Sequence, residues 1–367
     1  MAEALKNVYN QQFLAGLCGY IKPLLPDFPE TDFIRSVQDK NWKNRELKDR
    51  MRHISITLNQ YLPGSYRQQL KVITGIARQM LKEKPTQQSF PYLILADFIE
   101  QFGQDHLTVS LSAMEIVTQV TSCEFAIRPF IKRYPEEVMA QMLLWAKHPN
   151  PNVRRFSSEG CRPRLPWGMV LPDFIADPAP ILPILEILKT DSSEYVRKSV
   201  ANNLNDISKD HPEIVRRIAT RWYGTNKDVN WVVKHAVRTL LKKGDPAMLG
   251  LFGHAHDTPV SAKDLRLSAK SIAIGDQLEF SFAIRHDSEE TLSLRVEYFV
   301  YYRKARGHAQ KKIFKISESR YAPGKWHTIQ RKHSFRDLTT RKHHPGKHTL
   351  AIVVNGKELI QKDFDLQ

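Results

Sequence analysis

A helical pattern that recurs along this chain is clearest in Tyr195-Val196-Arg197-Lys198-Ser199-Val200-Ala201-Asn202-Asn203-Leu204-Asn205-Asp206-Ile207. Its apolar side chains return every three or four residues and form one stripe of an α-helix: Val196, Val200, Leu204 and Ile207. Lys198, Asn202 and Asp206 are spaced four apart on a different face. The segment therefore predicts an amphipathic helix with one buried face and one polar face.

Two other segments begin in the same way. Asn152-Val153-Arg154-Arg155 precedes this helix and Trp231-Val232-Val233-Lys234 follows it, with valines spaced about 40 residues apart, as in HEAT-like repeats. Such repeats stack helix pairs into a solenoid with a concave face. We therefore expect residues 1–258 to form an all-α HEAT-like solenoid. Proline marks many of its expected helix starts, namely Pro135, Pro151, Pro180, Pro212 and Pro246.

The pattern changes to alternation after residue 258. Every second residue is apolar in Leu278–Ile284 and in Leu292–Tyr302. Similar runs are separated by turn residues such as Pro323-Gly324, Pro345-Gly346 and Asn355-Gly356, and they cover 311–317, 327–335, 348–354 and 358–366. About seven short strands with this punctuation are typical of an immunoglobulin-like antiparallel sandwich. The sequence thus predicts a multidomain chain, with an all-β domain at 259–367 after the solenoid.

The charge of the chain indicates a polyanionic partner. Its 55 Lys and Arg outnumber 39 Asp and Glu, for a net charge of +16. Nucleic acid is the first candidate partner and an anionic membrane surface the second. No apolar run reaches membrane-spanning length, the first residues lack a signal-peptide core, and three distant cysteines do not suggest a disulfide framework. We expect a cytoplasmic protein.

Equivalent positions of the three repeats form rows across the predicted solenoid. The first row is cationic throughout and consists of Arg155, Lys198 and Lys234, while the second consists of Glu159, Asn202 and Arg238. Lys234, Arg238 and Lys242 are spaced as one basic stripe on a helix. A cationic row suits contact with a phosphate backbone. An ordinary solvated helix face is the alternative for each stripe.

The segment from Arg154 to Trp167 concentrates charge where a helix must stop. It holds Arg154, Arg155, Arg162 and Arg164 around Glu159, and we expect these four arginines to contact DNA. Pro163 and Pro166 then force the chain out of the helix and project Trp167 from a loop. A helix ion-pair network and a tryptophan that covers the core are the structural alternatives. Acids in a basic groove oppose DNA binding, so a catalytic role would explain Glu159 and Asp206.

Longer motifs resemble a known family along essentially the whole chain. They are Leu24–Phe28, Glu46–Ile54, Cys123-Glu124-Phe125-Ala126-Ile127-Arg128-Pro129-Phe130, the Arg162-Pro163-Arg164-Leu165-Pro166-Trp167 run and Val200–Lys209. The chain resembles the AlkC branch of the AlkD-like, HEAT-repeat DNA glycosylases, whose C-terminal immunoglobulin-like domain distinguishes it from the shorter AlkD type.

This resemblance implies removal of cationic alkylated bases, such as 3-methyladenine and 3-methylcytosine, from duplex DNA. It implies catalytic roles for Asp206, Glu159 and Glu124 and a lesion-binding role for Trp167. Carboxylates would stabilise the positive charge that develops on the sugar. The family implies hydrolysis without a lysine nucleophile, a deep base pocket or a cofactor. Glu124 has a plain alternative as a first-turn helix acid after a Ser122 cap.

The C-terminal domain is the more basic part per residue. It has 21 Lys and Arg against 12 Asp and Glu, a net of +9. Two expected loops concentrate this charge in Arg303, Lys304 and Arg306 and in Arg341 and Lys342. We expect them to grip the DNA backbone, with solvated basic loops as the alternative. His343, His344 and His348 lack a nearby acid or cysteine in sequence, so we expect no metal site.

Two other functional classes compete with a glycosylase. A non-enzymatic HEAT-repeat scaffold would bind DNA or an acidic protein without reaction. A metal-dependent nuclease would need clustered carboxylates for Mg²⁺, and the sequence shows no tight acidic cluster. We expect double-stranded DNA with alkylated bases as the partner, no membrane and a monomeric protein.

Overall fold

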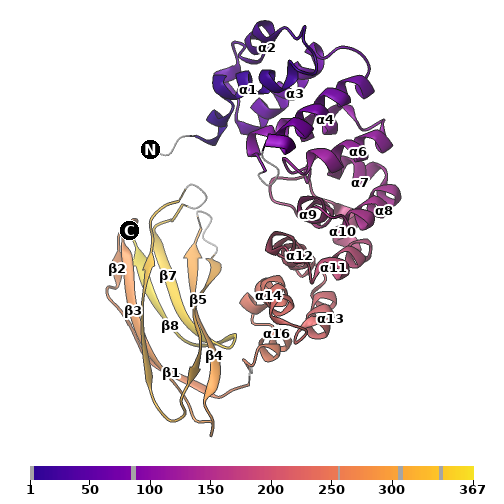
Figure 1. Ribbon diagram of the computed structural model, residues 1–367. Coiled ribbons are helices and arrows are strands. Elements are labelled where there is room, and N and C mark those ends of the chain that lie inside the picture. The colour runs from indigo at the N-terminus through magenta and orange to yellow at the C-terminus, as the bar shows by residue number, and fades with distance from the viewer. Residues whose placement is uncertain (1–3, 84–87, 255–256, 305–308, 339–341) are drawn as a thin grey trace. The chain divides into compact units, whose positions relative to one another are not determined.

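Helices occupy the first part of the chain and strands the rest (Figure 1). The computed structural model describes residues 4–83, 88–254, 257–304, 309–338 and 342–367. Among these residues, no helix is both long and apolar enough to span a bilayer. The helices in chain order are α1 (Gln11–Ile21), α2 (Glu30–Val37), α3 (Leu47–Tyr61), α4 (Tyr66–Glu83), α5 (Leu93–Phe102), α6 (Leu107–Val117), α7 (Ile127–Arg133), α8 (Pro135–Trp145), α9 (Pro151–Gly160), α10 (Pro172–Ala176), α11 (Leu182–Leu188), α12 (Glu194–Ile207), α13 (Pro212–Trp222), α14 (Lys227–Ala236), α15 (Arg238–Lys242) and α16 (Pro246–Leu251).

The repeat pattern places three helices side by side. α12 packs against α9 and against α14 (Figure 1). The repeat valines Val153, Val196 and Val232 are fully buried, and so are Val200 and the rest of the predicted α12 stripe. Four of the five marked prolines begin a helix, but Pro180 lies in a short 3₁₀ turn, Ala179–Ile181, ahead of α11. The all-α repeat region predicted from sequence is confirmed.

The strands form two sheets packed on a shared apolar core. They are β1 (Val260–Leu267), β2 (Ser271–Ile272), β3 (Gln277–His286), β4 (Leu292–Arg303), β5 (Ala309–Tyr321), β6 (His327–Ser334), β7 (Gly346–Val354) and β8 (Lys357–Leu366). One sheet has the order β1-β3-β6 and the other β2-β8-β7-β4-β5. The immunoglobulin-like sandwich is confirmed.

Two strands were missing from the sequence prediction. β1 alternates poorly because it is an edge strand with a bulge, at which Asp264 adopts a positive φ of 55°. β2 is only two residues long and pairs in parallel with β8, so the sandwich is not entirely antiparallel. Neither strand carries enough alternating apolar residues to be recognised from its pattern.

The chain divides into two compact units. One comprises Met1–His211 with Trp222–Ala236, and the other comprises Pro212–Arg221 with Val237–Gln367. The predicted domain boundary at residue 258 falls between α16 and β1. In the second unit, Gly244 and Gly356 approach so closely that a Cβ on Gly356 would lie 2.8 Å from the Cα of Gly244. A side chain at either glycine would separate the two segments.

Two substitutions on α12 test the buried face of this helix. Leu204→Ala removes a side chain that is 1% exposed, so we expect a loss of about 2–5 kcal/mol in the free energy of unfolding. Lys198→Ala changes an exposed position on the same helix and is expected to cost less than about 0.5 kcal/mol. Urea denaturation followed by the helical circular dichroism signal measures both. Equal losses would contradict the assigned faces.

Candidate active site: a buried network of carboxylates and arginines

The site is built around the C-terminal end of α9. Asn150 caps the start of this helix by accepting a hydrogen bond of 2.8 Å from the Asn152 amide, and Pro151 occupies its first position. The helix ends at Gly160, as the following prolines predict. A Cβ on Gly160 would lie 2.8 Å from the side chain of Ile127 and 2.9 Å from that of Met142. The glycine therefore lets α9 pack closely on α7 and α8 and fixes Glu159 beside it.

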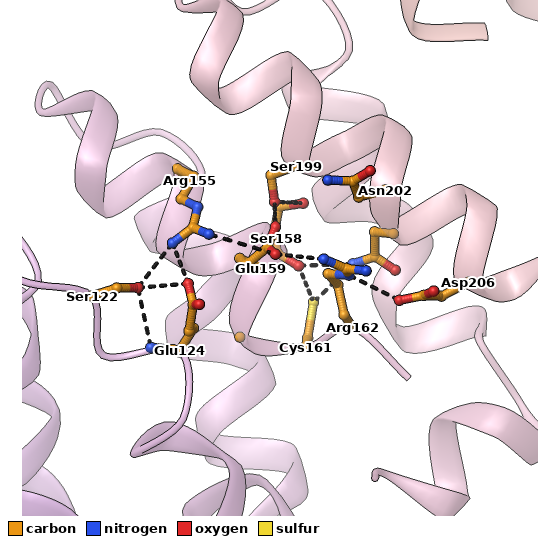
Figure 2. A network of polar contacts seen from close by, with 12 residues as sticks. Ser122, Glu124, Arg155, Ser158, Glu159, Cys161, Arg162, Ser199, Asn202 and Asp206 are labelled. Atoms are coloured by element: carbon orange, nitrogen blue, oxygen red, sulfur yellow. Dashed lines mark hydrogen bonds and ion pairs between the residues drawn. The ribbon is translucent and has the colours of Figure 1, made fainter. Parts of the chain in front are cut away.

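Arg162 joins two acids that lie far apart in sequence (Figure 2). Its Nη1 donates to Glu159 Oε1 at 2.5 Å, and its Nε donates to Asp206 Oδ2 at 2.8 Å. Glu159 lies at the end of α9 and Asp206 near the end of α12, in the next repeat. One guanidinium therefore connects two repeats through their two carboxylates.

Arg155 forms the second cationic centre of the network (Figure 2). Its Nη1 donates to Glu124 and, at 2.9 Å, to Ser122 Oγ, while its Nη2 lies 3.5 Å from Glu159 Oε1. Its guanidinium also stacks over the Tyr195 ring, 4.8 Å from the centroid. Glu124 precedes the start of α7 at Ile127, so it is a turn residue rather than a first-turn helix acid.

Other residues donate hydrogen bonds to the remaining carboxylate oxygens of Glu159 and Asp206. Ser199 Oγ donates to Glu159 Oε2 at 2.6 Å, and Lys209 Nζ donates to Asp206 Oδ1 at 2.8 Å. Three carboxylates are thus balanced by three cations among the residues of this network. Burial alone would lower the pKa of both Arg155 and Arg162, but the neighbouring carboxylates raise each pKa above its usual value overall. Both guanidinium groups therefore stay charged.

The burial of this network differs from the sequence prediction. The pattern indicated acids on the open polar face of the solenoid, whereas the side chain of Asp206 is only 3% exposed and that of Glu159 only 7%. The interpretation of an open face at these acids is wrong, because Arg162 lies against both of them. Lys209 is the exception among the partners, since its side chain is 40% exposed. Asp206 Oδ1 is therefore held by the one partner in this set that solvent reaches freely.

Trp167 projects from the loop after α9, as predicted. It is 65% exposed. Its backbone has a φ of 65°, in the left-handed region that residues other than glycine rarely adopt. Lys48 donates a hydrogen bond to its carbonyl oxygen. The buried Arg128 donates to Gly160 O at 2.9 Å and to Met169 O at 2.6 Å, which holds both ends of the loop. Burial lowers the pKa of Arg128 to about 10, so it remains charged at neutral pH.

The other predicted DNA-binding residues of the segment are engaged within the fold. Arg154 donates to both carboxylate oxygens of Asp191, at 2.5 and 2.9 Å, and to two backbone carbonyls. Arg164 forms a half-exposed bidentate pair with Asp210. Arg154 thus has a structural role, and DNA binding by either arginine stays a prediction.

Only part of the predicted cationic row of Arg155, Lys198 and Lys234 is exposed to solvent. Lys198 and Lys234 are exposed, whereas Arg155 is engaged in the network and its side chain is only 12% exposed. Asn202 Oδ1 accepts a hydrogen bond of 3.2 Å from His235 Nε2. Lys234, Arg238 and Lys242 do not lie on one continuous helix, because α14 ends at Ala236 and α15 begins at Arg238. Val237, with a ψ of 9°, interrupts the helix between them. A basic stripe formed by the three stays a prediction.

The C-terminal basic residues are placed only in part. Arg303, Lys304 and Lys342 are exposed, and Arg306 and Arg341 lie outside the described residues. His343 pairs with Asp337 at 3.0 Å, which is an acid that sequence spacing did not reveal. Within the described part of the chain, no group of three or more His, Cys, Asp or Glu residues is arranged to hold a metal ion.

Comparisons with known proteins identify the family. The DNA alkylation repair enzyme family profile matches residues 105–240, and the profile of the C-terminal Ig-like domain of the uncharacterised protein YhaZ matches residues 261–367. The protein YhaZ of Bacillus subtilis (strain 168) is 42% identical over 362 residues, which are 99% of each chain. The Pseudomonas fluorescens alkylpurine DNA glycosylase AlkC, solved bound to DNA containing an abasic site analog, is 34% identical, with a TM-score of 0.93 over 100% of both chains. The chain belongs to the AlkC branch of the DNA alkylation-repair glycosylases.

Sequence reasoning missed several members of this AlkC-family site. Ser122 was considered only as a helix cap, and Ser199 and Tyr195 were not singled out, although each contacts the network. Arg128 was visible only as part of a longer motif. Ser199 lies on the face of α12 that packs against α9. Knowledge of how the two repeats pack would therefore have identified it as a member of the site.

Two arginine substitutions test the buried bridge. Arg162→Ala leaves two buried carboxylates without their shared cation, so we expect a loss of about 3–5 kcal/mol in the free energy of unfolding. Arg164→Ala removes a half-exposed pair with Asp210 and is expected to cost less than about 1 kcal/mol. Denaturation curves of the two variants and the parent chain give both values. Similar small losses would show that the Arg162 bridge contributes little to stability.

Proposed function

We propose that this chain hydrolyses the N-glycosidic bond of cationic alkylated bases, such as 3-methyladenine and 3-methylcytosine, in duplex DNA. The observation that carries the proposal is the convergence of Glu124, Glu159 and Asp206 from three segments. The exposed Trp167 lies on the loop that follows the helix of Glu159. The AlkC structure with an abasic-site analog supports the same reaction class, since an abasic site is what base excision leaves.

The proposed chemistry uses fixed negative charge. Methylation of a ring nitrogen makes the base a good leaving group, and the bond electrons leave with the base. The sugar then becomes cationic, and a carboxylate held close to it lowers the energy of that state. One of Asp206 and Glu159 would also orient the attacking water. The reaction needs neither a lysine nucleophile nor a cofactor.

Lys209 gives Asp206 a route to the substrate. Both oxygens of Asp206 are occupied, but Oδ1 is paired with an ammonium whose side chain is 40% exposed. We infer that the developing sugar cation replaces this ammonium, while Arg162 keeps the carboxylate oriented through Oδ2. Exchange of one cation for another avoids leaving a buried acid unpaired.

DNA binding is proposed to draw on both parts of the chain. The exposed Lys198 and Lys234 suit phosphate contacts on the helical part, residues 1–258. Exposed cations of the domain at 259–367 would grip the backbone, from the end of β4 at Arg303 and from loops at Lys304 and Lys342. Trp167 would meet the cationic base or sugar with its ring face, an interaction of about 0.5–2 kcal/mol. We propose that the protein acts as a monomer.

Asp206→Asn tests the catalytic assignment. The amide keeps the shape but not the negative charge, so we expect near-normal DNA binding and single-turnover excision slowed at least about 100-fold. Release of base from methylated duplex, measured with EDTA present, reports the rate and silences any Mg²⁺-dependent nuclease. The matched control is Asp210→Asn, an acid four residues later whose partner is Arg164.

Three outcomes are informative for this assay. Slow excision in the Asp206 variant with an intact rate in the Asp210 variant supports the proposal. Full activity of Asp206→Asn would refute the assignment. No base release by the parent chain would favour a DNA-binding scaffold.

Charge removal tests the C-terminal contact. Neutralising Arg303, Lys304 and Lys342 together as glutamines should weaken duplex binding about tenfold or more and reduce the dependence of affinity on salt. The control neutralises Lys325, Lys357 and Lys362, which are exposed cations of the same domain. Fluorescence anisotropy over a salt series measures both triple variants. Equal weakening by the two sets would point to general charge instead of a local grip.

A further inference from the structure

A groove of about 330 Å³ lies between α4 and α6 in the first unit of the chain, and residues of these two helices line it. The two helices pack on each other (Figure 1). The helices with the main contacts to α9 and α12 are instead α8, α11 and α14. The groove is therefore separate from the carboxylate network, and the proposed reaction does not use it.

One wall of the groove carries three exposed cations from α4. They are Arg67, Lys71 and Arg78, and no acid is among the described residues that line the groove. Spacings of four and seven residues place the three on one side of the helix. At the rise of an α-helix they extend over about 16 Å. This wall therefore presents a line of positive charge beside the groove.

The charge of this wall is not balanced within the fold. α4 and α6 contain one acid each, Glu83 and Glu115. Glu83 accepts a hydrogen bond of 2.5 Å from a tyrosine of α1, and Glu115 accepts one of 2.6 Å from a tryptophan of α8. Both acids are thus engaged with other helices. In the part of the chain that the structure describes, none of the three cations is paired with a carboxylate.

The rest of the groove is mainly apolar. Leu70 on α4 and Val109 and Ile116 on α6 line it with aliphatic side chains. Its two hydroxyl groups are used within their own helices: Thr74 donates to a backbone carbonyl at 2.9 Å and Ser112 to another at 3.0 Å. The donors that remain for a partner therefore belong to the cations. An apolar surface beside unpaired guanidinium groups suits a partner that is both acidic and apolar.

We propose that this groove binds a short acidic segment of a partner protein. Carboxylates of the segment pair with the α4 cations, and a large apolar side chain of the segment covers the aliphatic residues between α4 and α6. About five residues of extended chain reach along the line of cations. A phosphate backbone would pair with the cations but would leave the aliphatic surface uncovered, so the groove favours a protein segment over nucleic acid. This inference does not depend on the proposed function.

Binding of a model peptide to the full chain tests the chemistry of the partner. The probe is a labelled heptapeptide of five aspartates with one leucine and one phenylalanine. Serines replace the aspartates in one comparison peptide, and glycines replace the leucine and the phenylalanine in the other. Fluorescence anisotropy should show that the probe binds at least about tenfold more tightly than either comparison peptide. Equal binding of either comparison peptide, or no binding of the probe, would overturn the proposal.

Removal of the α4 cations tests the place of binding. The groove variant carries three substitutions: Arg67→Gln, Lys71→Gln and Arg78→Gln. It should bind the acidic probe at least about tenfold more weakly than the parent chain. The matched control removes three exposed cations of the same unit that do not line the groove: Lys40→Gln, Lys43→Gln and Lys147→Gln. The control should stay within about twofold of the parent chain, and equal weakening of the two variants would overturn the proposal.

Ser112 offers a single-site test of the groove. Its side chain is exposed on α6, so a longer side chain at this position does not disturb the core. Ser112→Glu adds a carboxylate to the groove, and Ser112→Gln adds a side chain of the same shape without charge. The glutamate variant should bind the acidic probe at least about fivefold more weakly than the glutamine variant. Thermal unfolding followed by circular dichroism checks that both variants fold, and equal affinities would contradict binding in this groove.

Further measurements on the groove variant separate a protein segment from other occupants. Base release from methylated duplex and binding of a single-stranded oligonucleotide should both match the parent chain. Loss of either in the groove variant alone would identify nucleic acid as the occupant and overturn the proposal. Dimers of the parent chain in sedimentation velocity that the groove variant lacks would assign the groove to a second copy instead. A parent chain that binds the probe but releases no base would refute the proposed function and support this inference.

Discussion

The structure of the candidate site depends on one guanidinium placed between two acids. Arg162 binds Glu159 at the end of α9 and Asp206 near the end of α12, so it places one positive charge between two buried carboxylates and ties neighbouring repeats together. Without a shared cation these acids would repel each other in a poorly solvated place. The same bridge fixes the direction of each carboxylate before any substrate arrives. Fixed charge of this kind is what a reaction that creates a sugar cation requires.

This arrangement resolves a conflict between binding and catalysis. A basic protein attracts DNA, and exposed acids in its DNA-facing surface would oppose that attraction. Pairing each acid with arginine or lysine keeps the net charge near zero at the site. Only Asp206 is held on one side by a well-exposed partner, Lys209, which a sugar cation can replace. Under the proposed mechanism, Asp206 therefore becomes available to the positive charge on the sugar without being exposed to phosphate.

The sequence predicted the architecture better than the site. Buried valines at matching repeat positions and proline helix starts follow local rules, and the structure places Val153, Val196 and Val232 in the core. The site depends on side chains that meet across repeats, such as Ser199 with Glu159, and no local pattern encodes those meetings. Burial of Asp206 was missed for the same reason, because the covering Arg162 comes from another repeat. Helix periodicity alone also missed the interruption at Val237.

Affinity for a charged sugar mimic is the most direct test of the central claim. A duplex with a pyrrolidine abasic analog carries a cation where the sugar would become positive, and a tetrahydrofuran duplex has the same shape without charge. The account predicts that the chain binds the cationic duplex at least about tenfold more tightly, and that Asp206→Asn loses most of this preference. Equal affinity of the unaltered chain for the two duplexes would contradict the account.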